Sequence, residues 1–295
     1  MTATIDTTTD VGAVTPVSTP KRAGRSRSRL TTWGAAMWLI VIAIAALLAD
    51  FLPLLDPNET EPRIALESPS WSHPLGTDGL GRDQFSRIIH GAQVSLSVSI
   101  TAVAIGVIAG GILGLLAGYF RGRFEGVVLA VNDVVLAFPG LILLLVLLAY
   151  VGRSLLAISL IIGVLSIPLY TRVARANTLS VTEHDYVRAA RILGSGRRRI
   201  LQREILPNIV LPVSSYAFVA LGRVIVLEGS LAFLGLSVQP PDPTWGQMIA
   251  DSKQHLNDTY WPAIGPSAAM FFTVLSLSLI GDRMRHRIDV RGDTL

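Results

Sequence analysis

Apolar residues in this chain are gathered into long blocks that polar segments separate. Six blocks are prominent, and they lie at 33–52, 96–120, 134–151, 155–170, 209–236 and 261–280. Because a helix rises about 1.5 Å per residue, about 20 apolar residues cross a hydrocarbon core of about 30 Å. The pattern therefore predicts an all-α polytopic membrane protein with six transmembrane helices.

The polar segments divide the chain further. Residues 1–32 are expected to form a disordered basic tail, with the first transmembrane helix at 33–52. Pro and Gly are too dense over 53–91 for a continuous helix, so an irregular segment is expected there. Residues 92–282 then form a five-helix core that includes a short polar helix over 182–194, and residues 283–295 form a second tail.

The composition agrees with a membrane protein and argues against several kinds of catalyst. Of 295 residues, 51% are hydrophobic and 16% are charged, and cysteine is absent. The chain therefore has no disulfide, thiolate metal ligand or catalytic cysteine. All five histidines lie outside the apolar blocks and no His-Glu-x-x-His occurs. We expect no catalytic residue and no metal site on this chain, which is predicted not to be an enzyme.

Basic residues are strongly asymmetric along the chain. Nineteen fall in segments on one side of the predicted spans and five on the other, with Arg223 inside a span. Basic residues concentrate in cytoplasmic loops, so both termini are predicted to be cytoplasmic. We interpret the arginines as topology determinants rather than as a nucleic-acid site.

Lysine is nearly absent, since Lys21 and Lys253 are the only two among 25 basic residues. A phosphate-binding loop requires Gly-Lys-Ser/Thr, and neither lysine follows glycine. We therefore expect no nucleotide or other cofactor bound by this chain.

Arg223 and Glu228 are the ionisable residues deepest in a predicted span. Charges there are costly and should face protein or water. The two residues are five apart, so a direct ion pair on one helix is conceivable but not ideal. They are candidates for a translocation path or a subunit contact, and a structural contact within the chain is the alternative.

The segment 182–194 is predicted to be a short helix between two spans. Thr182 is a suitable N-cap, and Gly194 can end the helix in a left-handed conformation. Tyr186, Ala190 and Leu193 would share one face, which could admit another protein closely. The alternative is a loop packed on its own bundle.

This segment carries a resemblance to a known family. Arg188-Ala189-Ala190, Gly194 and then Leu206-Pro207 resemble the Glu-Ala-Ala-x₃-Gly coupling motif of binding-protein-dependent ABC importer permeases, with Arg188 in place of Glu and Glu204 at a usually apolar position. The segments His-Pro-Leu-Gly-Thr-Asp from His73 and Phe-Leu-Gly-Leu from Phe233 are similar to the second permease subunit of the dipeptide, oligopeptide and nickel systems.

The resemblance implies a division of labour among several chains. This chain would form half of the translocation path in a bacterial cytoplasmic membrane. Its partners would be a homologous permease, two ATPases that hold ATP and Mg, and an extracytoplasmic solute-binding protein. Arg188, Ala189, Ala190, Gly194, Leu206 and Pro207 would couple it to an ATPase. Di- or oligopeptides are the expected solute, with nickel and other solutes left open.

Two other classes of protein are alternatives to an importer permease. An ATP-independent secondary transporter or channel could also have six glycine-rich spans, but would not need the coupling helix. An intramembrane enzyme is disfavoured because no Ser–His dyad or facing pair of acidic residues lies in the apolar blocks.

Overall fold

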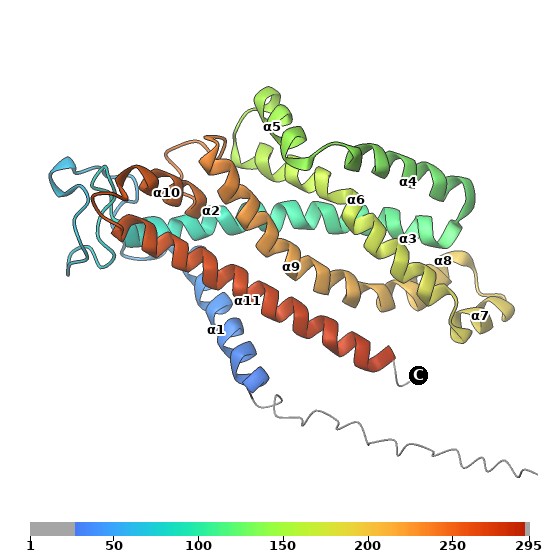
Figure 1. Cartoon of the computed structure of the whole chain (residues 1–295). Helices are drawn as coiled ribbons and strands as arrows, with labels where there is room; N and C mark the ends of the chain where they lie inside the picture. The colour runs from blue at the N-terminus through green and yellow to red at the C-terminus, as the bar shows by residue number, and fades with distance from the viewer. Residues whose placement is uncertain (1–26, 293–295) are drawn as a thin grey trace, which may run out of the picture.

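The computed structural model describes residues 27–292, with side chains described from 31 to 285. In this part of the chain the structure is helical, and the single β-type pairing is a bridge between Thr77 and Asp83 (Figure 1). The helices, in chain order, are α1 (Arg27–Leu47), α2 (Gln84–Ile105), α3 (Gly111–Phe120), α4 (Gly122–Ala137), α5 (Gly140–Val151), α6 (Leu155–Thr182), α7 (Asp185–Ile192), α8 (Arg197–Arg199), α9 (Leu206–Phe233), α10 (Trp245–Ser252) and α11 (Trp261–Gly292).

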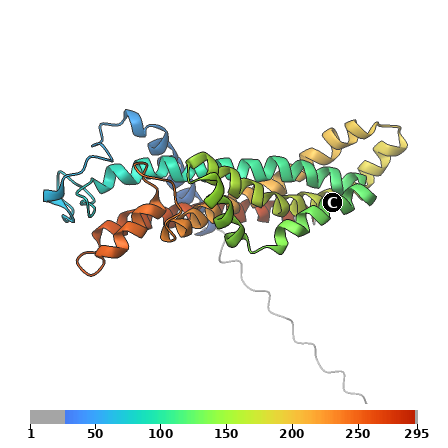
Figure 2. The same cartoon turned by 90° about the horizontal axis from the view of Figure 1, so that it is seen from above.

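The long helices form a bundle with distinct ends. The loop before α2 and the short helix α10 lie at one end, and α7 and α8 lie at the other (Figures 1 and 2). A π-helical turn over Gly106–Gly110 joins α2 to α3, giving a continuous helix of 37 residues. At about 1.5 Å per residue this helix is about 55 Å long, more than the hydrocarbon core requires. It therefore extends beyond the membrane.

The number of clear spans is smaller than the number of apolar blocks. Among the described residues, four helices are long and apolar enough to cross a membrane, and a bent pair could form a fifth span. The first block yields α1, whose described apolar part, Thr31–Leu47, is too short to be counted with them. The all-α membrane class is confirmed, and the six predicted helices are consistent with it.

The third block, 134–151, is not one helix. It is broken between α4 and α5, which meet at a bend of 85°. Phe138 is extended (φ −86°, ψ 138°) and Pro139 follows it. A proline lacks the N–H that would continue a helix and disfavours helical geometry at the preceding residue. The apolar count did not detect this break, because the residues of the block on both sides of it are apolar.

Glycines allow α3 and α6 to pack closely. Gly110, Gly114 and Gly118 recur every fourth residue and face α6. A Cβ added at Gly114 would lie 2.4 Å from the Thr171 carbonyl oxygen. Small residues at this spacing let two helix backbones approach, which is how membrane helices commonly associate.

The segment boundaries differ from the sequence-based ones at several points. The irregular segment ends at Asp83 rather than at 91, because the Asp83 carboxylate accepts a hydrogen bond from Ser86 N (2.7 Å) and caps α2. The helix α1 starts within the predicted tail 1–32, while residues 1–26 lie outside the described part. The helix α11 continues through most of the predicted tail 283–295.

Candidate functional site: the α7 hairpin and the charges along the bundle

The short helix α7 begins three residues later than predicted. Thr182 is the last residue of α6, and its hydroxyl donates to the Leu179 carbonyl (2.8 Å) instead of capping α7. His184 is extended (φ −69°, ψ 146°), and its carbonyl accepts hydrogen bonds from the amides of Val187 and Arg188. The expected N-cap was wrong because α6 extends well beyond the apolar block that predicted it.

The end of α7 is formed as expected. Gly194 has φ +79°, and its amide donates to the Arg191 carbonyl (3.1 Å). The next amide, of Ser195, donates to the Ala190 carbonyl (3.0 Å). These two bonds form a Schellman motif, in which a residue with positive φ closes the helix. Gly194 therefore closes the helix with a positive φ, a conformation that is energetically unfavourable for other residue types.

One small apolar residue anchors α7 to the bundle. Val187 is fully buried in a cluster with Ile200, Ile205 and Ile209. Ile192 and Leu193, in contrast, are 86% and 84% exposed. The helix α7 therefore packs on its own bundle by one side and leaves the other side exposed.

The face that the sequence predicted for contact with another protein, formed by Tyr186, Ala190 and Leu193, is mostly not the side of α7 that Val187 packs against the bundle. Tyr186 and Ala189 are exposed, and Ala190 is half-buried. Arg188 is also exposed, and its nearest carboxylate oxygen is that of Asp185, at 3.9 Å. Val187 was not predicted as a contact residue, although a valine between Tyr186 and Arg188 in a short polar helix was the available signal.

The second half of the motif lies beside the first. Leu206 and Pro207 begin α9, which continues from α8 through a π-helical turn over Ile200–Ile205 to form one helix of 37 residues. Asn208 Nδ2 donates to the Tyr186 hydroxyl (3.1 Å), linking α9 to α7. Partial burial, aided by the Glu204 carboxylate, raises the pKa of Tyr186 above its ordinary value.

Arg223 and Glu228 do not pair. Glu228 is buried, and its Oε1 accepts a hydrogen bond from Ser237 Oγ (2.6 Å), while Oε2 has no partner among the described residues. Arg223 is exposed on α9, and no ion pair to it is found in the described part of the chain. The two side chains therefore occupy different environments, and a pair five residues apart does not form.

Further charges on the bundle were not identified from the sequence. Arg172 Nη2 lies 2.7 Å from Asp133 Oδ1, and Arg175 Nε donates to Glu125 Oε1 (2.6 Å). These pairs join α4 to α6. The arginines were assigned to a loop because the fourth block was taken to end at Tyr170. In α4, Asp133 was the available signal, because a charge directly after an apolar stretch indicates a need for a polar partner.

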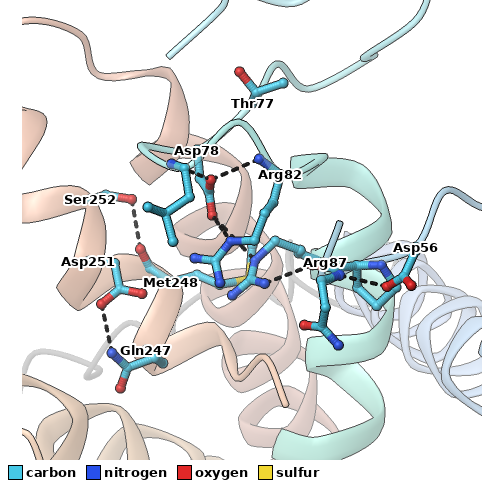
Figure 3. A network of polar contacts seen from close by, with 12 residues as sticks. Asp56, Thr77, Asp78, Arg82, Arg87, Gln247, Met248, Asp251 and Ser252 are labelled. Atoms are coloured by element: carbon cyan, nitrogen blue, oxygen red, sulfur yellow. Dashed lines mark hydrogen bonds and ion pairs between the residues drawn. The ribbon is translucent and has the colours of Figure 1, made fainter. Parts of the chain in front are cut away.

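A network of charges also lies at the α10 end of the bundle (Figure 3). The carboxylate of Asp78 accepts hydrogen bonds from the backbone amides of Leu80 and Arg82 and from Arg82 Nε (2.6 Å). Arg87 Nε lies 3.6 Å from the same carboxylate, and its Nη1 donates to the Pro57 carbonyl (2.8 Å). This network holds the loop against the start of α2.

Within the part of the chain that the structure describes, no group of three or more His, Cys, Asp or Glu residues could hold a metal ion. The arrangement is a helical bundle with a small displayed helix at one end and a charged loop at the other.

Comparison with known proteins gives consistent matches. The family model described as binding-protein-dependent transport system inner membrane component matches residues 110–291. A glutathione transport system permease protein from Pectobacterium atrosepticum is 38% identical over 251 residues, 85% of this chain and 83% of the relative. A dipeptide transport system permease protein from Alkalihalophilus pseudofirmus is 36% identical, over 86% and 85%.

A di/tripeptide transport system permease protein from Pseudomonas aeruginosa is 35% identical over 262 residues, 87% of this chain and 86% of the relative. The matches therefore cover the bundle, α7 and the loop at the other end together. This chain belongs to the family of inner-membrane components of binding-protein-dependent transport systems.

Proposed function

We propose that this chain is one of two permease subunits of an ATP-driven importer of di- or oligopeptides. The relatives named above carry peptide solutes in their names, and glutathione is itself a tripeptide. The chain would supply half of the path, and a homologous permease would supply the other half. Two ATPases would bind ATP and Mg, and an extracytoplasmic solute-binding protein would deliver the peptide.

The observation that carries the proposal is the exposed side of α7. Ile192 and Leu193 project from a helix that Val187 fixes to the bundle. Large exposed apolar side chains next to each other on a small rigid helix favour insertion into a groove of another protein. Arg188, Ala189, Ala190 and Gly194 would form the contact with the ATPase, and Leu206 and Pro207 would transmit its motion into α9.

The proposed orientation follows from the charges near α7. The consecutive arginines of α8, Arg197–Arg199, stand at this end of the bundle. Basic residues favour the cytoplasmic side, so the α7 end would face the cytoplasm, with both termini on that side. The α10 end would then face the solute-binding protein.

The charged residues along the spans would have two different roles. Arg223 is exposed on α9 and would face either the translocation path or the second permease, since an arginine turned toward lipid is costly. Glu228 is buried against Ser237, so it would serve as a structural contact within this chain.

Replacing Leu193 by Asp tests the coupling assignment. The side chain is already exposed, so the subunit should fold and insert normally. A charge in the apolar contact should sharply reduce the amount of ATPase that co-purifies, and peptide uptake should fall with it. Leu256→Asp is the matched control, because this leucine is also exposed but lies at the α10 end.

Three outcomes separate the alternatives. Loss of co-purified ATPase in Leu193→Asp with retention in Leu256→Asp supports the proposal. Normal ATPase retention and uptake in Leu193→Asp would show that α7 is not the contact. Peptide uptake by the purified chain in vesicles without any ATPase would instead favour a secondary transporter or channel.

A further inference from the structure

Four arginines stand at the start of the 37-residue helix that contains α9. Arg197, Arg198 and Arg199 form α8, and Arg203 follows in the π-helical turn Ile200–Ile205. All four side chains are exposed, and none of them takes part in an ion pair within the described part of the chain. Because the same helix continues to Phe233 and is apolar enough to cross a membrane, the cluster is continuous with a span.

The packing of this segment places the arginines at the edge of the apolar zone. Ile200 and Ile205 belong to a buried cluster against which Leu115 and Tyr119 of α3 pack. Both α3 residues lie in the last two turns of the apolar block 96–120, which polar residues follow. The arginines therefore lie near the level where the hydrocarbon core gives way to lipid headgroups.

Exposed apolar side chains continue the row of arginines along the helix. Arg199 and Arg203 are about one turn apart, and Leu206 and Val210 follow at intervals of three and four residues, so the four share one side. Leu206 is 40% exposed and Val210 is 49% exposed. This side of the helix thus carries cations at its outer end and apolar surface next to them, as the headgroup and acyl chain of a phospholipid require.

Carboxylates of the same segment leave the arginines unneutralised. Glu204 is the single acidic residue in the sequence from 197 to 210, and it is half-buried. Partial burial, together with the Glu204 carboxylate, raises the pKa of Tyr186, so this carboxylate lies near α7. A guanidinium group binds phosphate oxygens through paired hydrogen bonds, which makes an arginine cluster well suited to a phosphate-bearing headgroup.

We propose that Arg199 and Arg203 bind the headgroup of an anionic phospholipid, with one acyl chain lying along Leu206 and Val210. Clusters of four or more basic residues directly beyond a span are attracted to anionic lipids. An acidic surface of an ATPase could also pair with the arginines, but it would leave the apolar end of the row without a role. The lipid accounts for both ends.

This site goes beyond the proposed function, because it involves neither the peptide nor ATP. It requires only that the helix containing α9 crosses the membrane. Loss of the α7 contact in Leu193→Asp would leave the lipid site intact, and failure of the lipid site would leave the coupling proposal intact.

The test uses the assembled transporter in phosphatidylcholine nanodiscs that contain a small fraction of phosphatidylglycerol with a photoreactive diazirine on one acyl chain. Labelling of the peptide that contains Leu206 and Val210 is measured by mass spectrometry, and phosphatidylcholine with the same diazirine chain is the reference. One arginine near the membrane surface favours an anionic lipid about fivefold, so the wild type should prefer phosphatidylglycerol by more than about tenfold. Arg199→Gln and Arg203→Gln should each lower this preference about fivefold, and the double variant should abolish it.

Arg63→Gln is the matched control, because this arginine is also exposed and without an ion pair among the described residues but lies in the loop before α2. It should keep the preference for phosphatidylglycerol, and Arg203→Lys, which retains the charge, should keep most of it.

Three results would overturn the proposal. The first is equal labelling by the two lipids in the wild type. The second is a preference that excess inorganic phosphate removes and sodium chloride of equal ionic strength does not, which would indicate a site for free phosphate. The third is an unchanged preference in the double variant, and loss of co-purified ATPase in that variant would then assign the arginines to the protein contact.

Discussion

The two short helices at opposite ends of the bundle, α10 and α7, differ in where their large apolar side chains lie. At the α10 end, Trp245 is fully buried, and its indole N–H donates to the Ile88 carbonyl (3.0 Å). At the α7 end, Ile192 and Leu193 project outward, while buried Val187 and the hydrogen bond between Tyr186 and Asn208 hold the helix to the bundle. The helix α10 is thus fixed by buried contacts within this chain, whereas α7 leaves Ile192 and Leu193 uncovered.

The difference indicates which substitutions should affect folding and which should affect assembly. A buried side chain contributes to the free energy of unfolding through the area that it removes from water. An exposed side chain contributes little to folding, so its effect depends on a partner protein. Changes at the α10 end should therefore lower stability, and changes at α7 should lower association with little loss of stability.

Trp245→Ala should have the largest effect. Truncating a buried aromatic side chain costs about 3–5 kcal/mol, because the cavity that remains is only partly refilled. We expect a marked fall in the thermal unfolding temperature of the detergent-purified chain, followed by circular dichroism. Trp245→Phe retains a ring and should fall between the wild type and Trp245→Ala. Equal stability of all three proteins would contradict the description of this end as internally fixed.

Gly194→Ala should have a moderate effect that is confined to α7. A positive φ costs a residue with a Cβ about 1 kcal/mol relative to glycine, and nothing lies within 4 Å of the position to obstruct a methyl group. The last turn of α7 should fray, and co-purification of ATPase should fall several-fold while the unfolding temperature changes little.

Gly196 provides the control for that experiment. It has an ordinary backbone conformation (φ −65°) and is likewise free of close neighbours. Gly196→Ala should therefore behave as the wild type. If both variants lost ATPase equally, a general effect of added side chains in this turn would replace the conformational explanation.

Arg188→Ala should have the smallest effect on stability. The side chain is exposed, and within the described part of the chain it pairs with one carboxylate, that of Asp185, at 3.9 Å. Exposed ion pairs contribute little to folding, so the unfolding temperature should be indistinguishable from that of the wild type. Co-purification of ATPase then reports the contact itself, and an unchanged amount would remove Arg188 from the proposed coupling residues.

Local features of the sequence were sufficient for much of α7. The left-handed conformation at Gly194 was predicted because few other residues adopt it readily. The start of the helix was not predicted, because Thr182 is an adequate cap in isolation and lost that role when α6 continued through it. A cap is decided by where the preceding helix ends, and that depends on packing against α3.

The charges along the bundle also show that local sequence features do not determine contacts that depend on packing. The sequence identified Glu228 as a residue that needs a polar environment, and Ser237 provides a hydrogen bond to it from the loop after α9. The pairs of α4 with α6 were missed, since Asp133 and Arg172 are far apart in the sequence. Distance along the chain carries no information about such pairs until the helices are packed.

The sequence by itself determined the helical membrane class, the family and the short helix between two spans. These follow from the length of apolar blocks, the spacing of motif residues and the conformational preferences of single residues, all of which are local. Only the tertiary structure decided the break at Pro139 and the burial of Val187, which anchors α7. It also decided that Arg87 and Asp251 line the same cavity. These depend on which distant segments come into contact, because burial and unsatisfied hydrogen bonds exist only once the helices have packed.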